Sequence, residues 1–351
     1  MVSNRPNRPI KRSPQTDEGP EKPYALVPFP RQRPFLKAPI GHHRYADNCY
    51  HGTLYLTLKV LTALHVSTGV TALGSDVGSR VPLIKTMVQG KEQQLLIQGS
   101  SLKGCIRAIY EAITNSTLAV ITNYYRQKMP RDRLPYGTKG SLCSKEKLCP
   151  ASQVFGALDW QGLVHFTDAT CESTKSVTGF MPSLHRPRPD RRDAYFERGE
   201  AAGRKFYRHA VKAVDGGDRG IPVQQAGTEF TFKTEIHFRN LTEAQLGTLL
   251  IALGQDSKYP MALKLGGGKP VGMGTVQVAI SKLEVTQDVR DRYSHYTPPA
   301  AETLTEEKVA QFIQEKTQAA KTSKLVELPQ LEALAEILQW PTNWTAPEGM
   351  Y

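Results

Sequence analysis

A glycine-rich segment holds the residues of this sequence best suited to contact a phosphate. Residues 265–278 read LGGGKPVGMGTVQV, with five glycines in nine residues and Lys269 among them. Glycine lets backbone N–H groups come close to an anion and form a concave binding surface. A nucleotide-binding P-loop needs Ser or Thr after its lysine, whereas Pro270 follows here, so that alternative is rejected. A wide loop that tolerates glycine is the other interpretation. The candidate phosphate ligands are Gly266, Gly267, Gly268, Lys269 and Gly272.

A second candidate lies at the start of a predicted amphipathic helix, residues 99–116, which opens GSSLKGCIR. Ser100 or Ser101 suits the N-cap position, and free N–H groups at a helix N-terminus attract anions. Lys103 and Arg107 are four residues apart and share a helix face. We therefore predict a phosphate contact by Ser100, Ser101, Lys103 and Arg107. An ordinary capped helix with solvated charges is the alternative.

The third candidate is a basic stretch, residues 183–212, with nine Lys or Arg and four acids. Aromatic residues alternate with these cations, and this composition is typical of a groove for single-stranded RNA. We predict an insertion that binds RNA; a solvated loop is the alternative. Its cationic residues are His185, Arg186, Arg188, Arg191, Arg192, Arg198, Arg204, Lys205 and Arg208, and its aromatic residues are Phe196, Phe206 and Tyr207. Within it, the candidate RNA-binding residues are Arg204, Lys205, Tyr207 and His209.

Composition limits the classes of function. The 351 residues carry a net charge of +12, which favours a polyanionic partner, and 39% of them are hydrophobic, enough for a core. No run of 18 apolar residues is present, and the polar residues 1–30 do not resemble a secretory signal. Five cysteines are few and odd in number, which favours a reducing compartment, so we expect a cytoplasmic protein.

Hydrophobic periodicity predicts an α+β fold. Extended segments and helices follow one another in the order strand, helix, strand, basic insertion, strand, helix, strand, which suggests a ferredoxin-like sheet. We expect an N-terminal basic arm over residues 1–49, a central α+β domain over 50–285, which the family resemblance described below implies is RNA-binding with an insertion at about 174–214, and a C-terminal helical extension over 286–351. The predicted strands are 50–66, 81–88, 93–98, 161–169, 229–238 and 274–283, a loop occupies 67–79, and the later helices are 241–254, capped by Thr242, and two within 305–340 broken near Pro329.

Four segments together resemble a known family. They are LTALHVSTG (61–69), GSSLKGCIR (99–107), VFGALDWQGLVHFTDA (154–169) and LGGGKPVGMGTV (265–276). In order and spacing they resemble the RAMP superfamily (repeat-associated mysterious proteins) of CRISPR–Cas systems, over about residues 50–285. PYALVPFP and GRKFYRH are similar to segments of type III-D-like subunits.

The resemblance implies a backbone subunit of a type III interference complex in antiviral defence. Such subunits have a modified RNA-recognition-motif core and polymerise along the crRNA, with target RNA paired alongside and other effector subunits as partners. A thumb-like hairpin separates bases of the duplex, and the insertion at 174–214 is the candidate for it. Phe180 and Met181 are candidate wedges, with local packing as the alternative.

The resemblance also raises the question of cleavage. Target cutting in this family depends on a divalent metal such as Mg²⁺ and on an acidic residue after the first strand. Arg80 or Val81 stands where that acid is expected, which leaves Asp76 as the candidate catalytic residue. The alternative enzyme is a stand-alone, metal-independent repeat-RNA processing endonuclease, for which His65, Tyr207 and His209 are candidates.

Cys143 and Cys149 are candidate ligands of a structural zinc ion. Related proteins carry a Cys-Pro-x-Cys element here, but Ser152 replaces one thiolate. Since structural zinc takes four ligands, Cys105 and Cys171 are the remaining candidates.

Overall fold

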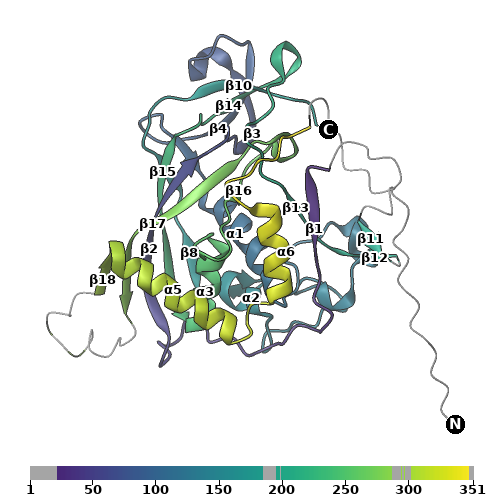
Figure 1. Ribbon diagram of the computed structural model, residues 1–351, viewed down its shortest axis with the longest axis vertical. Coiled ribbons are helices and arrows are strands. Elements are labelled where there is room, and N and C mark those ends of the chain that lie inside the picture. Colours follow the sequence, from purple (N-terminus) through teal and green to yellow (C-terminus); the bar gives the residue numbers. More distant parts are fainter. Residues whose placement is uncertain are drawn as a thin grey trace.

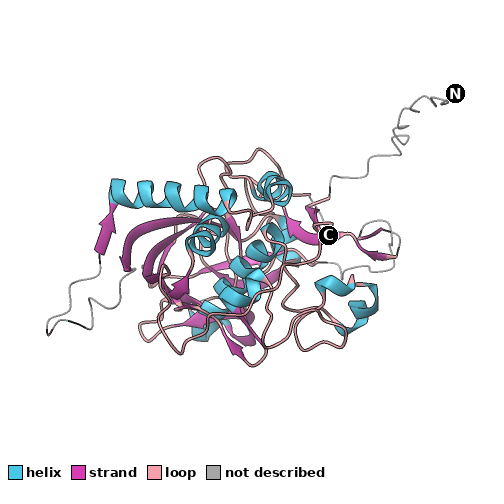
Figure 2. Cartoon of the chain, turned by 90° about the horizontal axis from the view of Figure 1, so that it is seen from below, coloured by secondary structure: helices cyan, strands magenta, loops and turns pink. Residues whose placement is uncertain are grey.

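The computed structural model describes residues 22–184, 195–197, 199–286, 294, 296 and 302–347, and the fold below is that of these residues. One large sheet runs through the molecule, and its strands follow the order β10-β14-β4-β5-β9-β15-β2-β17-β16 (Figure 1). Helix α3 contacts α1, α5 and strand β15, so the helices form a layer beside the central strands (Figure 2). The predicted α+β class is confirmed.

Three long antiparallel strands form the centre of this sheet. β2 lies between β15 and β17, and the short strands β8 and β9 pair with the other edge of β15. Leu54, Leu56, Leu58 and Val60 alternate along β2 and are all buried, which explains the period of two in the sequence. The bounds are β2 Tyr50–Val60, β8 Val164–Phe166, β9 Ala169–Cys171, β15 Thr231–Leu241 and β17 Thr275–Thr286.

Helix α1 follows the short strand β5, and helix α3 follows β15. α3 begins with a capping box in which Thr242 and Gln245 exchange side-chain and backbone hydrogen bonds, so the predicted N-cap is confirmed. The predicted serine cap of α1 is wrong. Its first N–H, that of Gly99, instead donates to the Asp168 carboxylate at 2.7 Å. The helices are α1 Gly99–Ile113, α2 Pro150–Phe155, α3 Glu243–Ala252, α5 Glu306–Thr322 and α6 Leu328–Leu338.

The far end of the sheet is a smaller group of strands. β3 and β4 form a hairpin, so the loop expected at 67–79 is in part a strand. Most side chains of β3 are exposed on both faces, and a strand of that kind leaves no alternating pattern to detect. The strands are β3 Ser67–Leu73, β4 Leu83–Gln89, β5 Leu95–Ile97, β10 Val177–Met181 and β14 Ile221–Gln225. At the opposite end of the strand order, β16 (Leu263–Lys264) pairs with β17.

The N-terminal segment pairs as a strand with part of the basic stretch. β1 (Tyr24–Pro28) pairs antiparallel with β13 (Gly203–Tyr207), and β11 (Phe196–Glu197) pairs with β12 (Glu200–Ala201). His185, Arg186, Arg188, Arg191, Arg192 and Arg198 lie outside the described residues.

The C-terminal part contains two helices, as predicted. Pro329 lies in the first turn of α6, where its missing N–H costs nothing, so the proline starts a helix rather than breaking one. The short strand β18 (Glu302–Thr305) precedes these helices and pairs with β17. Outside the C-terminal part, β6 (Gly156–Ala157) pairs with β7 (Trp160–Gln161) after α2. Within the described part of the chain, no helix is both long enough and apolar enough to cross a membrane.

Candidate nucleic-acid interface

Three segments far apart in the sequence meet at one pocket of about 400 Å³, called here the glycine-loop pocket. Helix α1, strand β13 and the glycine-rich loop each contribute a wall, and the cations concentrate on two of them. The polar and glycine residues that line it are Ser101, Gly104, Arg204, Lys205, Tyr207, Lys264, Gly266 and Lys269. Positive charge in a concave surface attracts an anion. The pocket therefore unites residues from all three sequence candidates.

The glycine-rich loop presents only part of its length to this pocket. Gly266 and Gly267 are half-buried, whereas Gly268 and Gly272 are buried. A Cβ at Gly272 would lie 2.7 Å from the Lys212 carbonyl oxygen, and one at Gly268 would lie 2.3 Å from the Met273 sulfur. These two glycines therefore serve internal packing, and the surface available to a ligand centres on Gly266, Gly267 and Lys269.

Hydrogen bonds join the loop to the segment that follows β2. The Gly267 N–H donates to the His65 carbonyl at 2.8 Å, and the Gly274 N–H donates to the Ala63 carbonyl at 2.9 Å. The N–H of Gly267 already donates to a protein carbonyl. Gly267 could therefore serve an anion site by letting the backbone approach closely, not by donating a hydrogen bond.

A buried lysine lies beneath the pocket. The Lys264 ammonium donates to the Thr275 hydroxyl at 3.3 Å, and burial together with the neighbouring Lys269 lowers the pKa of Lys264 to about 7. Sequence reasoning missed this residue, although only Leu265 separates it from the glycines. A phosphate in the pocket would favour its charged form, so anion binding there would be accompanied by proton uptake at Lys264.

His209, predicted to contact RNA, is instead an interior residue. It is 1% exposed; its Nε2–H donates to the Ala262 carbonyl, and its Nδ1 accepts from the Thr275 hydroxyl, both at 3.0 Å. Burial, with Lys264 nearby, lowers its pKa to about 3. Both ring nitrogens are bound inside the protein, so His209 supports the pocket floor.

The first turn of α1 departs from the expected phosphate site. The Asp168 carboxylate already occupies the anion position at the helix N-terminus, since it accepts from the Gly99 N–H. Ser100 is exposed, and only Ser101 lines the glycine-loop pocket. An anion is therefore expected at the Ser101 side of the helix, away from the Asp168 charge.

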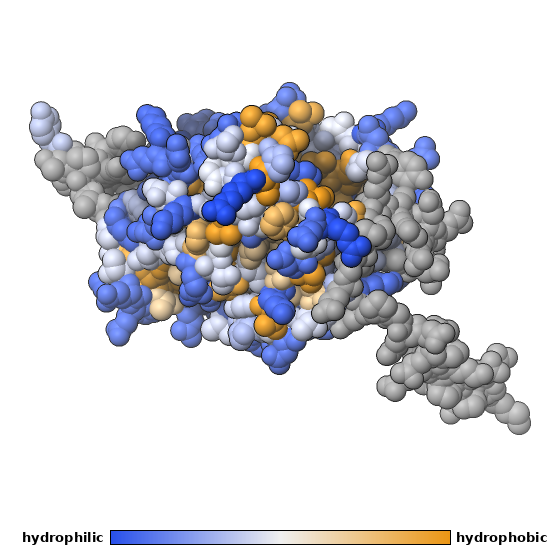
Figure 3. All heavy atoms as spheres, turned by 90° about the horizontal axis from the view of Figure 1, so that it is seen from above, coloured by the Kyte–Doolittle hydropathy of each residue, from blue (hydrophilic) through white to orange (hydrophobic). Residues whose placement is uncertain are grey.

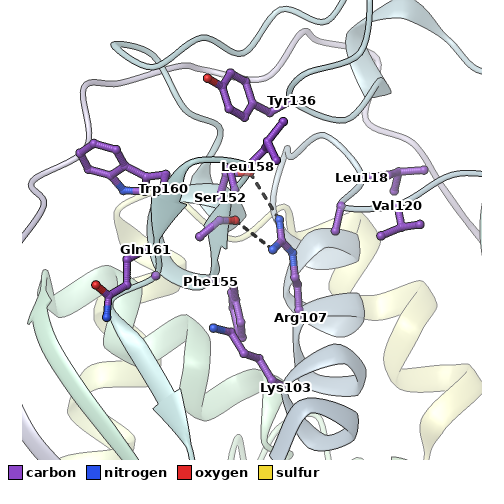
Figure 4. A pocket seen from close by; sticks show the side chains of 14 residues that line it. Lys103, Arg107, Leu118, Val120, Tyr136, Ser152, Phe155, Leu158, Trp160 and Gln161 are labelled. Carbon is purple, nitrogen blue, oxygen red and sulfur yellow. Dashed lines mark hydrogen bonds between the residues drawn. The ribbon is translucent and has the colours of Figure 1, made fainter.

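Lys103 and Arg107 lie on a different face of α1, as their spacing from Ser101 dictates. Residues two apart on a helix point in nearly opposite directions. Both line a second pocket of about 490 Å³, which also contains Tyr136, Phe155 and Trp160 (Figure 4). Ser101, Lys103 and Arg107, predicted to form one site, are thus divided between two pockets, one on each side of α1.

A shared carboxylate connects these two sides. Arg107 donates from Nε to the Glu111 carboxylate at 2.7 Å, and Arg204 of β13 binds the other oxygen of the same group. Arg107 also donates to the Gly156 carbonyl and, at 3.5 Å, to the Ser152 hydroxyl (Figure 4). The Glu111 side chain is fully buried, so it holds both guanidinium groups in position.

The two candidate wedges differ in accessibility. Met181 is buried in a small cluster with Val223, Val271 and Met273, which supports local packing, and Phe180 is half-buried.

Figure 3 looks onto the end of the molecule with β3, β4, β10 and β14, where hydrophobic side chains lie among hydrophilic ones. The exposed large hydrophobic residues of these strands are Val70, Leu73, Leu83 and Val177.

The residues considered for cleavage are not gathered in one place. Asp76 is exposed in the β3–β4 connection, where its carboxylate accepts from the Ser75 hydroxyl. His65 is buried and donates from Nδ1 to the Gln224 carbonyl at 2.7 Å; burial lowers its pKa. This hydrogen bond inside the protein fits a structural role for His65. Burial raises the pKa of Tyr207.

Among the described residues, no group of three His, Cys, Asp or Glu side chains could hold a metal ion. Asp76 therefore belongs to no such group in the described part of the chain, and no step through Mg²⁺ is derived. Cys143 and Cys149 do lie together beside the Thr117 hydroxyl, and their mutual hydrogen bond, with burial, raises the pKa of Cys143. Cys105 instead donates to the Lys264 carbonyl. The described residues thus supply two thiols where structural zinc takes four ligands.

Comparison with known proteins identifies the family. The model of the RAMP superfamily matches residues 57–277. The chain belongs to the RAMP superfamily. The matched span of this RAMP protein contains α1, β13 and the glycine-rich loop, the three elements of the glycine-loop pocket. No curated protein gives a match.

Among solved structures, the RAMP chain is similar to a chain in a cryo-EM structure of the type III-B Cmr-beta complex bound to cognate target RNA. The sequence identity is 16% and the TM-score 0.34. The match covers 68% of this chain and 61% of that chain, so it spans about three fifths of the length of the solved chain.

Proposed function

We propose that this RAMP protein is a crRNA-binding backbone subunit of a type III CRISPR–Cas interference complex, which holds the duplex of crRNA and target RNA. The glycine-loop pocket carries the proposal. Arg204, Lys205, Lys264 and Lys269 line it together, beside a loop whose glycines leave room for a backbone. Cations at a close-approach loop suit the repeated phosphates of RNA.

The strand order supports a modified RNA-recognition-motif core. The chain runs β2, α1, β8 and β9, β15, α3, β17, and these strands lie in the order β17, β2, β15, then β8 and β9. A ferredoxin-like unit has this alternation of strands and helices, with neighbouring strands antiparallel. In the proposal, crRNA, target RNA and other effector subunits are the partners, and the cytoplasm is the location.

The domain boundaries are part of the same proposal. Residues 50–285 form the RNA-binding domain, preceded by the arm and followed by the helical extension. Within the insertion at about 174–214, β10 is a candidate for the duplex-separating element because Phe180 is half-buried on it. The exposed Leu73 and Leu83 of the neighbouring hairpin add apolar side chains at this end of the molecule.

The decisive experiment is isolation of the full-length chain with its cellular RNA. The chain is co-expressed with its neighbouring effector genes and a CRISPR array, and the bound RNA is sequenced. We expect spacer-containing crRNA, and its loss from the variant Arg204→Ala/Lys205→Ala/Lys269→Ala. Lys59→Ala/Lys233→Ala is the matched control, because these lysines form exposed ion pairs on the sheet. Equal crRNA recovery from both variants would refute the assigned site.

Target-RNA cleavage is the second candidate function, favoured by one observation. The Asp76 carboxylate is exposed at the end of the β3–β4 hairpin, where a bound duplex could reach it. Mg²⁺ is commonly held by one or two carboxylates together with substrate phosphates, so a lone carboxylate suits a site that is completed by RNA.

A further inference from the structure

A third pocket, of about 460 Å³, lies between β13 and the segment 118–129. It is called here the aromatic pocket, after the rings of Tyr125, Tyr195, Phe196 and Tyr207 that line it. Its volume lies in the range of about 300 to 1,000 Å³ typical of sites for small organic groups. The remaining described lining is mainly apolar, with contributions from Leu26, Leu118, Val120, Ile121 and Met129.

The rings in and beside this pocket are arranged in two groups, one of which includes Tyr24, a residue outside the lining. Tyr24 stacks on Tyr195, with ring centroids 5.7 Å apart and planes 11° from parallel. Tyr125 lies against Phe196 at 6.1 Å, with the planes tilted by 31°. Aromatic faces at a pocket wall are stacking platforms for nucleobases, and they accept every base because every base has a π-face.

A cation is held among the rings. The Lys205 ammonium lies 4.0 Å from the ring centroid of Tyr24 and 4.7 Å from that of Tyr207. Arg204, beside it in sequence, is fixed by Glu111. Of the described residues that line the aromatic pocket, none is acidic. A ligand with a flat apolar ring and an adjoining negative charge therefore complements it.

The aromatic pocket shares a wall with the glycine-loop pocket. Arg204, Lys205 and Tyr207 line both. A strand with a phosphate in the glycine-loop pocket would thus have its neighbouring nucleotide beside the rings. We propose that the aromatic pocket takes one unpaired nucleobase of the bound RNA strand, with the adjoining phosphate on Arg204 and Lys205. This inference rests on the proposed RNA-binding function and adds a site for one base beside the contacts to its phosphate.

The test separates base contacts from backbone contacts. The probes are a twelve-nucleotide oligouridylate and a fully abasic RNA of the same length, titrated against the full-length chain by fluorescence anisotropy at one salt concentration. We expect the wild type to prefer the oligouridylate by about tenfold, the effect of stacking one base. In Tyr125→Ala this preference falls to below about threefold while affinity for the abasic strand is unchanged.

Three variants make the result specific. Tyr125→Phe keeps the ring and should keep the preference. Tyr136→Ala, which removes a ring from the pocket beside Arg107 and not from this one, should also keep it. Ala201→Leu fills the aromatic pocket and should abolish the preference, which provides a second variant if Tyr125→Ala does not fold.

The outcomes are distinguishable. A preference that survives both Tyr125→Ala and Ala201→Leu would overturn the base pocket, as would equal affinity of the wild type for both probes. Either result would leave the proposed RNA binding intact. If the wild type binds neither probe, the proposed function fails and this inference fails with it. Crosslinking of a 4-thiouridine probe to peptides within 118–129 or 199–207 would be the positive result.

Discussion

Arg107 and Arg204, from helix α1 and strand β13, bind the two carboxylate oxygens of one buried residue, Glu111. Arg107 faces the pocket beside Trp160, and Arg204 faces the two pockets on the other side of the helix. One side chain therefore sets the position of cations in all three pockets. Charged groups held in place before binding lose less side-chain entropy when a ligand arrives.

Replacement of Glu111 by Gln should lower both stability and RNA affinity. The variant leaves two guanidinium groups near a neutral amide, and loss of one partner from a buried ion pair is costly. Because both arginines retain some exposure to water, we expect a loss of about 2 kcal/mol in the free energy of unfolding, measured by urea denaturation. Glu229→Gln, in an exposed pair with Lys59, is the control and should change stability by less than about 0.5 kcal/mol. Equal effects of the two variants would contradict this role of Glu111.

Adjacent glycines of the loop should respond differently to alanine. A Cβ at Gly266 would lie 2.2 Å from the His65 carbonyl oxygen on a backbone with φ of +71°, so Gly266→Ala should destabilise the protein. A Cβ at Gly267 finds its nearest neighbours at 3.9 Å, so Gly267→Ala should fold normally. If RNA approaches the backbone here, Gly267→Ala should still weaken RNA binding. Thermal unfolding and anisotropy measure the two effects, and full affinity in a folded Gly267→Ala would argue against close approach.

RNA affinity should decline as the pH rises above neutrality. The pKa of Lys264 is about 7 in the free protein, and a bound phosphate raises it. Binding then takes up a proton, so the gain is fully present below pH 7 and is lost as the pH passes through the higher pKa of the complex. His209, with a pKa of about 3, stays neutral throughout. Lys264→Met should flatten the profile between pH 6 and 9; an unchanged profile would remove Lys264 from the site.

Salt dependence should identify the phosphate contacts. Each cation that neutralises a phosphate of a single strand adds about 0.7 to the steepness of log affinity against log salt. The triple variant Arg204→Ala/Lys205→Ala/Lys269→Ala should therefore reduce the slope by roughly 2, uniformly across RNA sequences. Lys59→Ala/Lys233→Ala should leave it unchanged, and a parallel loss in this control would indicate only a general effect of net charge.

Cleavage should depend on Asp76 if the assembled complex cuts target RNA. Complexes that carry Asp76→Ala should then fail to cut a complementary RNA at the position opposite this subunit. EDTA should abolish the same cut by the wild-type complex. A cut that persists with Asp76→Ala would exclude this carboxylate. Cleavage that resists EDTA would instead favour the repeat-processing alternative.

Local patterns predicted the central elements well, because each has one buried face. The alternation in β2 and the apolar stripe of α1 are direct consequences of that burial. The hairpin strand β3, exposed on both faces, carries no such pattern and was expected as a loop.

Most residues of the candidate site could be predicted from the sequence, but their division between separate pockets could not. Helical spacing separates Ser101 from Lys103, yet only the fold shows that each faces a different pocket. Asp168 and Glu111 have partners distant in sequence, Gly99 and Arg204 respectively, so no local motif reveals their roles. The role of Lys264 depends on its burial, which the sequence alone does not show. His209 and Gly272 were candidate ligand contacts, but both are buried and serve internal packing.

The pairing of β1 with β13 has a consequence for how the interface is assembled. Tyr24 faces Tyr207 across this ladder, so the two cations of β13 are placed by a strand from the opposite end of the chain. Contacts between such distant segments form late in folding, since the intervening chain must first be closed into a loop. A ribosome releases β1 long before its partner is made. The RNA-binding surface should therefore mature last, after the central sheet, and a chain that loses residues 24–28 should fold around its core while leaving β13 as an open edge prone to association.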